Sequence, residues 1–160
     1  MNSEKLNHTL DRLESYIKDY TIINTRVSQG SIAWHIDHSL KVINNVCNAS
    51  IESDPSTYLN NFTFLGKLFF TLGFFPRGKA KAPKHVKPPK VITEESLVLQ
   101  IEDARSNINK INTLDKNAYF NHPLFGHVNT TRVNRFLILH TNHHLKIIND
   151  ILKQQKTLSK

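Results

Sequence analysis

Residues 133–151 read VNRFLILHTNHHLKIINDI, and the spacing of the apolar residues in this stretch decides the fold. One row of side chains recurs at intervals of four and three residues: Val133, Leu137, His140, His144, Ile147 and Ile151. This spacing is typical of an amphipathic helix whose buried face packs against a neighbouring helix. We therefore predict a long helix here, running to about Gln154, with two histidines on its buried face.

His140 and His144 lie four residues apart, so on a helix their Cβ atoms are about 5–6 Å from each other. Two imidazole rings placed in this way can bind one divalent metal ion, which is the functional hypothesis. The alternative is a pair of core histidines held by hydrogen bonds, since H-x-x-x-H recurs by chance in a chain with nine histidines. A buried neutral imidazole without a partner costs about 1–3 kcal/mol, and metal ligation satisfies two rings together.

Three further stretches have the same spacing of apolar residues. Residues 3–20 and 97–114 each predict an amphipathic helix. Ser31 is a suitable N-cap for another helix that runs to about Asn48. One row of side chains on that helix consists of Trp34, His38, Val42 and Val46. His38 is thus a third histidine among apolar neighbours. Four helices without a convincing strand pattern predict an all-α four-helix bundle, formed as one domain by residues 1–160.

Other reactive residues on the predicted second helix are expected to serve minor roles. His35 is placed at the surface or beside the ligands, with exposure favoured because Ser39 is its neighbour four residues on. Asp37 points about 100° round the helix from His38 and is predicted to be a surface charge. Cys47 is the only cysteine, so the chain forms no internal disulfide. We expect it to be a buried or half-buried thiol in a reducing compartment.

An aromatic-rich segment and a basic segment separate the predicted second and third long helices. Residues 62–75 include Lys67 and two glycines, and the segment is shorter than the about 20 apolar residues that a membrane span needs. We expect one or two short helices there, which pack in the core or cover a pocket. Residues 77–90 contain six cations together with prolines, a composition that predicts a solvated extended connection.

The net charge of +8 admits nucleic acid or acidic ligands as partners. The excess is concentrated in residues 77–90, where no aromatic side chain alternates with the cations, as a single-strand binding surface would require. Nucleic acid is therefore not expected as a partner, and neither is a membrane. The polar residues 1–11 lack the apolar core of a signal peptide, which predicts a cytoplasmic protein.

Two short blocks of the sequence resemble the DinB superfamily of metal-binding four-helix bundles, also described as DinB/YfiT-like. The first is Ser31-Ile32-x-Trp34-x-x-x-His38, and the second is His140-x-x-His143-His144. Residues 121–126, NHPLFG, and residues 76–78, PRG, resemble one branch of that superfamily whose members are mostly of undefined function. The resemblance implies the fold that the helical spacing predicts, with the aromatic and basic segments inserted between the second and third helices.

The resemblance also implies a three-histidine site that commonly holds zinc or nickel. Transferred to this sequence, the metal ligands are His38, His140 and His144, whereas His143 matches a position that is not a primary ligand. Many relatives continue after the paired histidines with arginine, glycine and glutamine, but this chain has Leu145-Lys146-Ile147. Members of the superfamily often pair as homodimers, so the resemblance admits a homodimer here, although the sequence alone does not determine the oligomeric state.

Three neutral imidazoles around a divalent ion leave a further position for water or substrate. Such an ion lowers the pKa of bound water toward about 7, or it binds and deprotonates a thiol. Relatives that use low-molecular-weight thiols favour the second chemistry. The first hypothesis is therefore a metal-dependent enzyme acting on a small molecule, as a thiol transferase ahead of a hydrolase. The alternative is a non-catalytic bundle that the metal stabilises and that serves as a binding or interaction module.

Overall fold

The computed structural model describes residues 2–77 and 86–158, and within them the chain is mostly helical with one small sheet. Its elements in chain order are α1 (Asn2–Ser15), η1 (Ile17–Asp19), α2 (Ile32–Glu52), η2 (Pro55–Thr57), α3 (Phe64–Leu72), α4 (Glu94–Ile111), β1 (Tyr119–His122), β2 (Gly126–Asn129) and α5 (Thr130–Leu158). Most of the segment predicted to be a basic extended connection, residues 77–90, lies outside the described residues.

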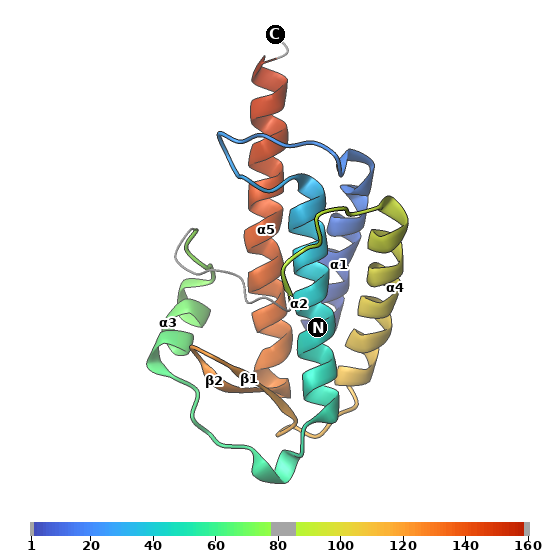
Figure 1. Cartoon of the computed structure of the whole chain (residues 1–160). Helices are drawn as coiled ribbons and strands as arrows, with labels where there is room; N and C mark the ends of the chain where they lie inside the picture. Colours follow the sequence, from blue (N-terminus) through green and yellow to red (C-terminus); the bar gives the residue numbers. More distant parts are fainter. Residues whose placement is uncertain (1, 78–85, 159–160) are drawn as a thin grey trace.

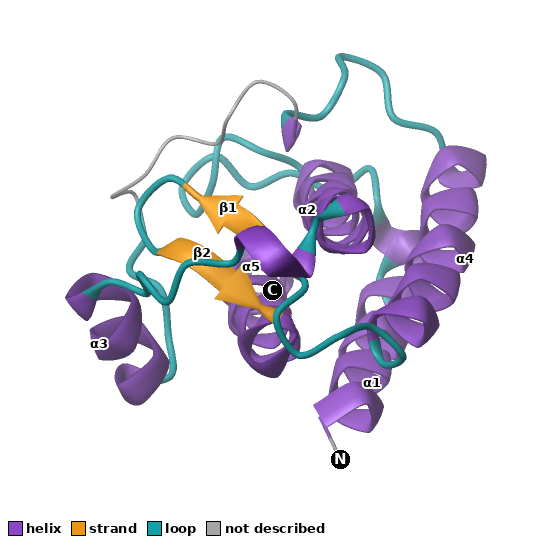
Figure 2. Cartoon of the chain, turned by 90° about the horizontal axis from the view of Figure 1, so that it is seen from below, coloured by secondary structure: helices purple, strands orange, loops and turns teal. Residues whose placement is uncertain are grey.

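The four long helices pack side by side around a common core (Figures 1 and 2). Both α1 and α2 contact α4 and α5, so each of the two N-terminal helices touches each of the two C-terminal ones. The rows predicted on α1 and α4 are buried, including Leu6, Leu10 and Leu13 on α1 and Leu97, Ile101 and Ile108 on α4. On α2 and α5 the buried face is wider than the predicted row, because Ile36, Leu40 and Ile43 on α2 and Leu145 and Ile148 on α5 are also fully buried.

The beginning of α2 is capped as the sequence predicts. The backbone N–H of Trp34 donates a hydrogen bond to Oγ of Ser31, which satisfies one of the free amides of the first turn. The helix continues four residues beyond the predicted end at Asn48 and stops at Glu52, before Pro55. This cap fixes where α2 starts and so fixes the position of His38 along it.

The first helix is shorter than predicted, ending at Ser15 instead of about residue 20. The N–H of Tyr16 donates to the Leu13 carbonyl at 3.1 Å, a bond between residues three apart that tightens the chain out of α-helical geometry. Residues Ile17–Asp19 then form a 3₁₀ turn in which Ile17 is still buried. The apolar spacing thus continues beyond Ser15, although the regular α-helix ends there.

A two-stranded antiparallel hairpin precedes α5, although the sequence showed no convincing strand pattern. Its strands pair Phe120 with Val128, and both side chains are buried. Each strand has four residues, too few to show clear alternation in the sequence. Gly126 begins β2 with a φ of +74°, and a Cβ there would lie 2.6 Å from the backbone oxygen of Asn61. The prediction of an all-α chain is thus wrong in this one region.

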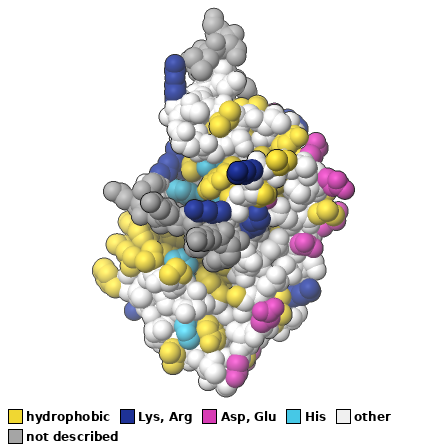
Figure 3. Space-filling view, in the orientation of Figure 1, with side chains coloured by type: hydrophobic (Ala, Val, Ile, Leu, Met, Phe, Trp, Pro, Cys, Tyr) yellow, Lys and Arg dark blue, Asp and Glu magenta, His cyan; other side chains and the backbone are white. Residues whose placement is uncertain are grey.

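The aromatic segment contributes only part of its side chains to the core. Phe62 and Phe70 are buried and their rings meet edge to face at 5.1 Å. One face of α3 points outward, and Phe64 on it is 80% exposed. We call this the α3 outer face; it comprises Phe64, Leu65, Leu68 and Leu72. Figure 3 shows hydrophobic side chains gathered in this region of the surface. Core packing, the role expected for the segment, therefore holds for its inner side chains alone.

None of the helices within residues 2–77 and 86–158 is both long enough and apolar enough to cross a bilayer. The longest helix, α5, extends past the ends of its neighbours (Figure 1), but it is amphipathic. The buried apolar residues of α5 pack in the core described above.

Candidate metal centre

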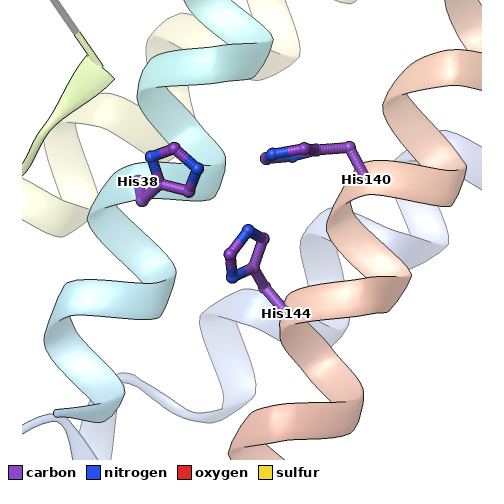
Figure 4. A group of neighbouring side chains, drawn as sticks. All are labelled: His38, His140 and His144. Atoms are coloured by element: carbon purple, nitrogen blue, oxygen red, sulfur yellow. The ribbon is translucent and has the colours of Figure 1, made fainter. Parts of the chain in front are cut away.

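Three histidines that are far apart in the sequence meet between α2 and α5. His38 projects from α2, and His140 and His144 project toward it from successive turns of α5 (Figure 4). One potential ligand atom from each side chain lies within 4.8 Å of those of the other two. The structure thus brings together the three residues that the sequence singled out, in a group that could hold a metal ion.

Aromatic side chains enclose this group. The Trp34 ring stacks on His38 with centroids 5.1 Å apart, and the Phe136 ring stacks on His140 at 6.1 Å. His38 is 5% exposed and His144 is 7% exposed. Part of His140 reaches the surface, while its Nδ1 atom is enclosed. The histidines therefore face a largely apolar environment with limited access to water.

A backbone carbonyl orients His38. Its Nδ1 lies 2.8 Å from the carbonyl oxygen of Val86. Because a carbonyl oxygen can only accept, Nδ1 carries the proton and donates it. In a neutral imidazole the other nitrogen, Nε2, then has a free lone pair. His38 is held in the tautomer in which Nε2 can bind a metal ion.

His140 carries a buried nitrogen without a partner. Among the described residues its Nδ1 makes no hydrogen bond, although the atom is buried. Leaving such a group unsatisfied costs about 1–3 kcal/mol. The unpaired nitrogen sits on a ring that faces two other imidazoles, and three imidazoles are a donor set that suits zinc or nickel. The residues present fit a bound divalent ion.

His144 contacts His35, which the sequence placed at the surface. The two Nδ1 atoms are 3.0 Å apart, and Nε2 of His35 lies 2.9 Å from Oγ of Ser28. His35 is 3% exposed, so the expectation of exposure is wrong and the alternative, a place beside the ligands, describes it. The reason is that the loop before α2 folds over His35, a contact that helical periodicity cannot show.

Burial keeps the clustered histidines neutral. It lowers the pKa of His35 from 6.5 to about 4 and lowers the pKa values of His140 and His144 well below 6.5. The pKa of His38 is also lowered, chiefly by burial, although its hydrogen bond to Val86 opposes the shift. Repulsion among the neighbouring rings acts in the same direction for all of them. Neutral imidazole is the form that binds metal ions, so the site is prepared for ligation at neutral pH.

Asp37 is not the surface charge that the sequence predicted. It is 2% exposed, it pairs with Lys41 at 2.8 Å, and it accepts a hydrogen bond from the side-chain amide of Gln100 on α4. The prediction that Asp37 and His38 point in different directions is correct. The side chain of Asp37, however, faces α4 and not solvent. Asp37 therefore ties two helices together and takes no place in the histidine group.

Cys47 is a buried free thiol, as expected from the sequence. Burial raises its pKa to about 12, so the thiolate is not formed at neutral pH. A nucleophile or metal ligand must be a thiolate. Cys47 is therefore an inert core residue.

A cavity of about 240 Å³ lies beside the histidine group, on the flank of α5. It is lined by Gly73, Phe74, Phe75, Pro76, Arg77, Leu139, Asn142, His143 and Lys146. His143 donates from Nδ1 to the Phe75 carbonyl at 2.9 Å, and its ring centroid is 5.0 Å from that of His144. The half-buried His143 thus lines this cavity and contacts His144, whereas His38, His140 and His144 themselves do not line it.

Geometry and chemistry within this chain both support a metal centre. Three neutral imidazoles converge from two helices, one of them carries an unpaired buried nitrogen, and a cavity lies alongside. Comparison with known proteins adds no relative to this picture, because no protein-family model, no curated protein and no solved structure matches the chain significantly.

Proposed function

We propose that this chain is a metal-dependent enzyme in which His38, His140 and His144 hold one divalent ion, within a four-helix bundle of the DinB type. The observation that carries the proposal is the convergence of one ligand atom from each ring to within 4.8 Å of the others. Burial keeps all three rings in the neutral form that ligates metals. Zinc and nickel are the ions that we propose, since both accept imidazole ligands.

The number of protein ligands supports catalysis over a purely structural ion. Structural zinc sites use four protein ligands, whereas three leave a position for water or substrate. A bound ion supplies an acidic water molecule or stabilises a thiolate. The chain itself contributes three oriented neutral rings, and the stacked Trp34 and Phe136 rings limit the access of bulk water.

The reaction that we propose is transfer of a low-molecular-weight thiol to an electrophilic small molecule, ahead of hydrolysis. The thiol gives up its proton to water, its sulfur forms a bond to the electrophilic carbon, and the leaving group departs with the electron pair of the broken bond. The cavity beside His143 supports a small-molecule substrate. Its lining joins aromatic side chains to Lys146 and to Arg77, whose guanidinium already pairs with Asp150 at 2.7 Å. Lys146 is therefore the cation that suits an organic molecule with an anionic group.

Metal content per chain tests the site directly. We expect about one zinc or nickel ion per chain in protein purified without a histidine tag, and none in a variant with both His140→Ala and His144→Ala. His143→Ala is the matched control, because His143 lies on the same helix but outside the group, and this variant should keep its metal. Equal metal contents in the wild type and the double variant would refute the assignment.

Turnover tests the reaction. We expect the metal-loaded protein, but not the double variant, to conjugate at least one member of a panel of cellular thiols to an electrophile such as a chlorinated nitrobenzene. Activity confined to ester or phosphoester substrates would replace the transferase with the hydrolase. No metal-dependent turnover with either panel would count against an enzyme.

The second candidate is a non-catalytic bundle that the metal stabilises. It is favoured by one observation, that the ligand candidates come from two different helices, so an ion would join α2 to α5. This candidate predicts that removing the ion lowers the melting temperature while no small molecule competes for the open coordination position. The visible spectrum of the cobalt-substituted protein distinguishes the enzyme from the non-catalytic bundle, because it changes when a thiol displaces water from the bound ion.

A further inference from the structure

A chain of hydrogen-bond partners runs from the loop before α2 to the histidine group. It consists of Ser28 Oγ, the two ring nitrogens of His35, and Nδ1 of His144, with spacings of 2.9 and 3.0 Å. His35 and His144 are both buried. No carboxylate takes part, so each hydrogen bond must be made between one atom that carries a proton and one atom that accepts it.

Two arrangements of protons satisfy the whole chain when both rings are neutral. In the first, His144 Nδ1–H donates to His35 Nδ1, and His35 Nε2–H donates to Ser28 Oγ. In the second, every donor is reversed, so that Ser28 O–H donates to His35 Nε2 and His35 Nδ1–H donates to His144 Nδ1. The second arrangement leaves the proton of His144 on Nε2, where no lone pair remains for a metal ion.

Only the first arrangement is therefore compatible with metal binding by Nε2 of His144. The structure shows the same solution at His38, where a backbone carbonyl accepts from Nδ1 and leaves Nε2 free. At His144 that acceptor is the ring of another histidine. Partners of this kind commonly fix the tautomer and orientation of metal-bound histidines.

We propose that His35, held by Ser28, is the positioning residue that orients His144 and keeps its Nε2 lone pair directed at the metal. This inference rests on the proposed metal site. His35 itself is not a ligand: its Nδ1 accepts from His144, and its Nε2 donates away from the site to the serine.

Hydrogen bonds from backbone N–H groups hold Ser28 in place within its loop. The N–H of Ser28 donates to the Asn24 carbonyl at 3.0 Å, and the N–H of Gly30 donates to Oγ of Ser28, also at 3.0 Å. With one lone pair of Oγ occupied by Gly30, the other accepts from His35. The position of His35 is thus set from the loop as well as from α2.

Zinc affinity measured by competition with a chromophoric chelator tests the proposal. His35→Phe keeps a ring but removes both nitrogens, and we expect it to weaken zinc binding by about 10- to 100-fold. His35→Asn places an amide oxygen near the position of Nδ1, so it should restore affinity to within a few-fold of the wild type. Ser28→Ala should have a smaller effect than His35→Phe, since it loosens His35 without removing the acceptor.

The tautomer of His144 provides a readout that a purely structural role would not change. In the zinc-loaded wild type, ¹⁵N NMR of the ring nitrogens should show a metal-bound Nε2 and a protonated Nδ1 for His144. Zinc bound through Nδ1 of His144, or zinc bound to His35, would overturn the proposal. So would wild-type zinc affinity in His35→Phe, or equal losses in His35→Phe and His35→Asn.

Failure of the metal site itself gives a different result. If the wild type binds no zinc, the proposed function falls, and the role of His35 falls with it. If the wild type binds zinc through His38, His140 and His144 while His35→Phe binds equally well, the metal site stands and only the positioning role is lost. Should His35→Phe fail to fold, Ser28→Ala and His35→Asn still give both readouts.

Discussion

Buried neutral histidines gather where α2 and α5 meet. His35, His38 and His144 are all buried. Their ring nitrogens form hydrogen bonds with residues outside their own helical turn. Desolvation of several imidazoles is costly unless the protons are placed correctly. The histidine group therefore makes the fold sensitive to any change that adds a proton.

Acid should destabilise the metal-free protein in a defined pH range. The pKa of His35 is about 4 in the folded state, whereas an unfolded histidine titrates near 6.5. Below pH 6.5 the unfolded chain binds more protons than the folded one, so stability is complete above that pH and is lost as pH falls toward 4. We expect the melting temperature to fall between pH 6.5 and 5, before most carboxylates titrate.

Scanning calorimetry in the presence of a chelator measures this dependence. His35→Asn removes one of the contributing groups and should make the decline between pH 6.5 and 5 shallower. A melting temperature that stays constant over that range would mean that the buried rings accept protons as readily as in the unfolded chain.

For individual side chains, the sequence was sufficient where helical spacing determines the direction in which the side chain points. His38, His140 and His144 were found in this way, because each lies on an apolar row. His35 and Asp37 were misplaced because their burial comes from partners distant in the sequence, the loop at Ser28 and Gln100 on α4. The serine and glycine residues that precede α2 were a signal for a turn, but they gave no indication of what the turn covers.

Among the elements, the hairpin positions the start of α5. Its second strand ends at Asn129 and α5 begins at Thr130, so the two are continuous. The hairpin was missed because strands of four residues carry little pattern, and only Pro123 between them and Gly126 at the start of β2 are turn-forming residues that the sequence shows. The long helices were predicted because each repeats its apolar row over several turns.

Gly126→Ala should destabilise the protein more than Gly73→Ala. Both glycines have a φ of +74°, where a side chain costs about 1–2 kcal/mol. A Cβ at Gly126 also meets the backbone oxygen of Asn61 at 2.6 Å, whereas a Cβ at Gly73 meets no atom within 4 Å. The expected difference is a melting temperature several degrees lower for Gly126→Ala. Equal losses would show that Asn61 moves aside freely.

Across the whole molecule, the histidine group connects the two halves of the chain. His38 comes from the N-terminal pair of long helices, and His140 and His144 come from the C-terminal pair. A ligand that binds only the folded state stabilises it, by about 2.7 kcal/mol at a concentration 100 times its Kd. An ion at this site therefore acts on global stability as well as on chemistry.

Zinc should raise the melting temperature of the wild type. For a protein of 160 residues, stabilisation of about 2.7 kcal/mol corresponds to roughly 5–10 °C. The double variant with His140→Ala and His144→Ala should show no such increase, and His143→Ala should retain it. The same increase in the double variant would place the stabilising ion elsewhere.

The α3 outer face has a consequence for the behaviour of the protein in concentrated solution. Its phenylalanine and leucine side chains remain in water although each Å² of apolar surface costs about 25 cal/mol there. Salts such as ammonium sulfate increase that cost because they are excluded from protein surfaces. The α3 outer face is accordingly expected to lower solubility at high salt, while the net charge of +8 keeps the molecules apart at low salt.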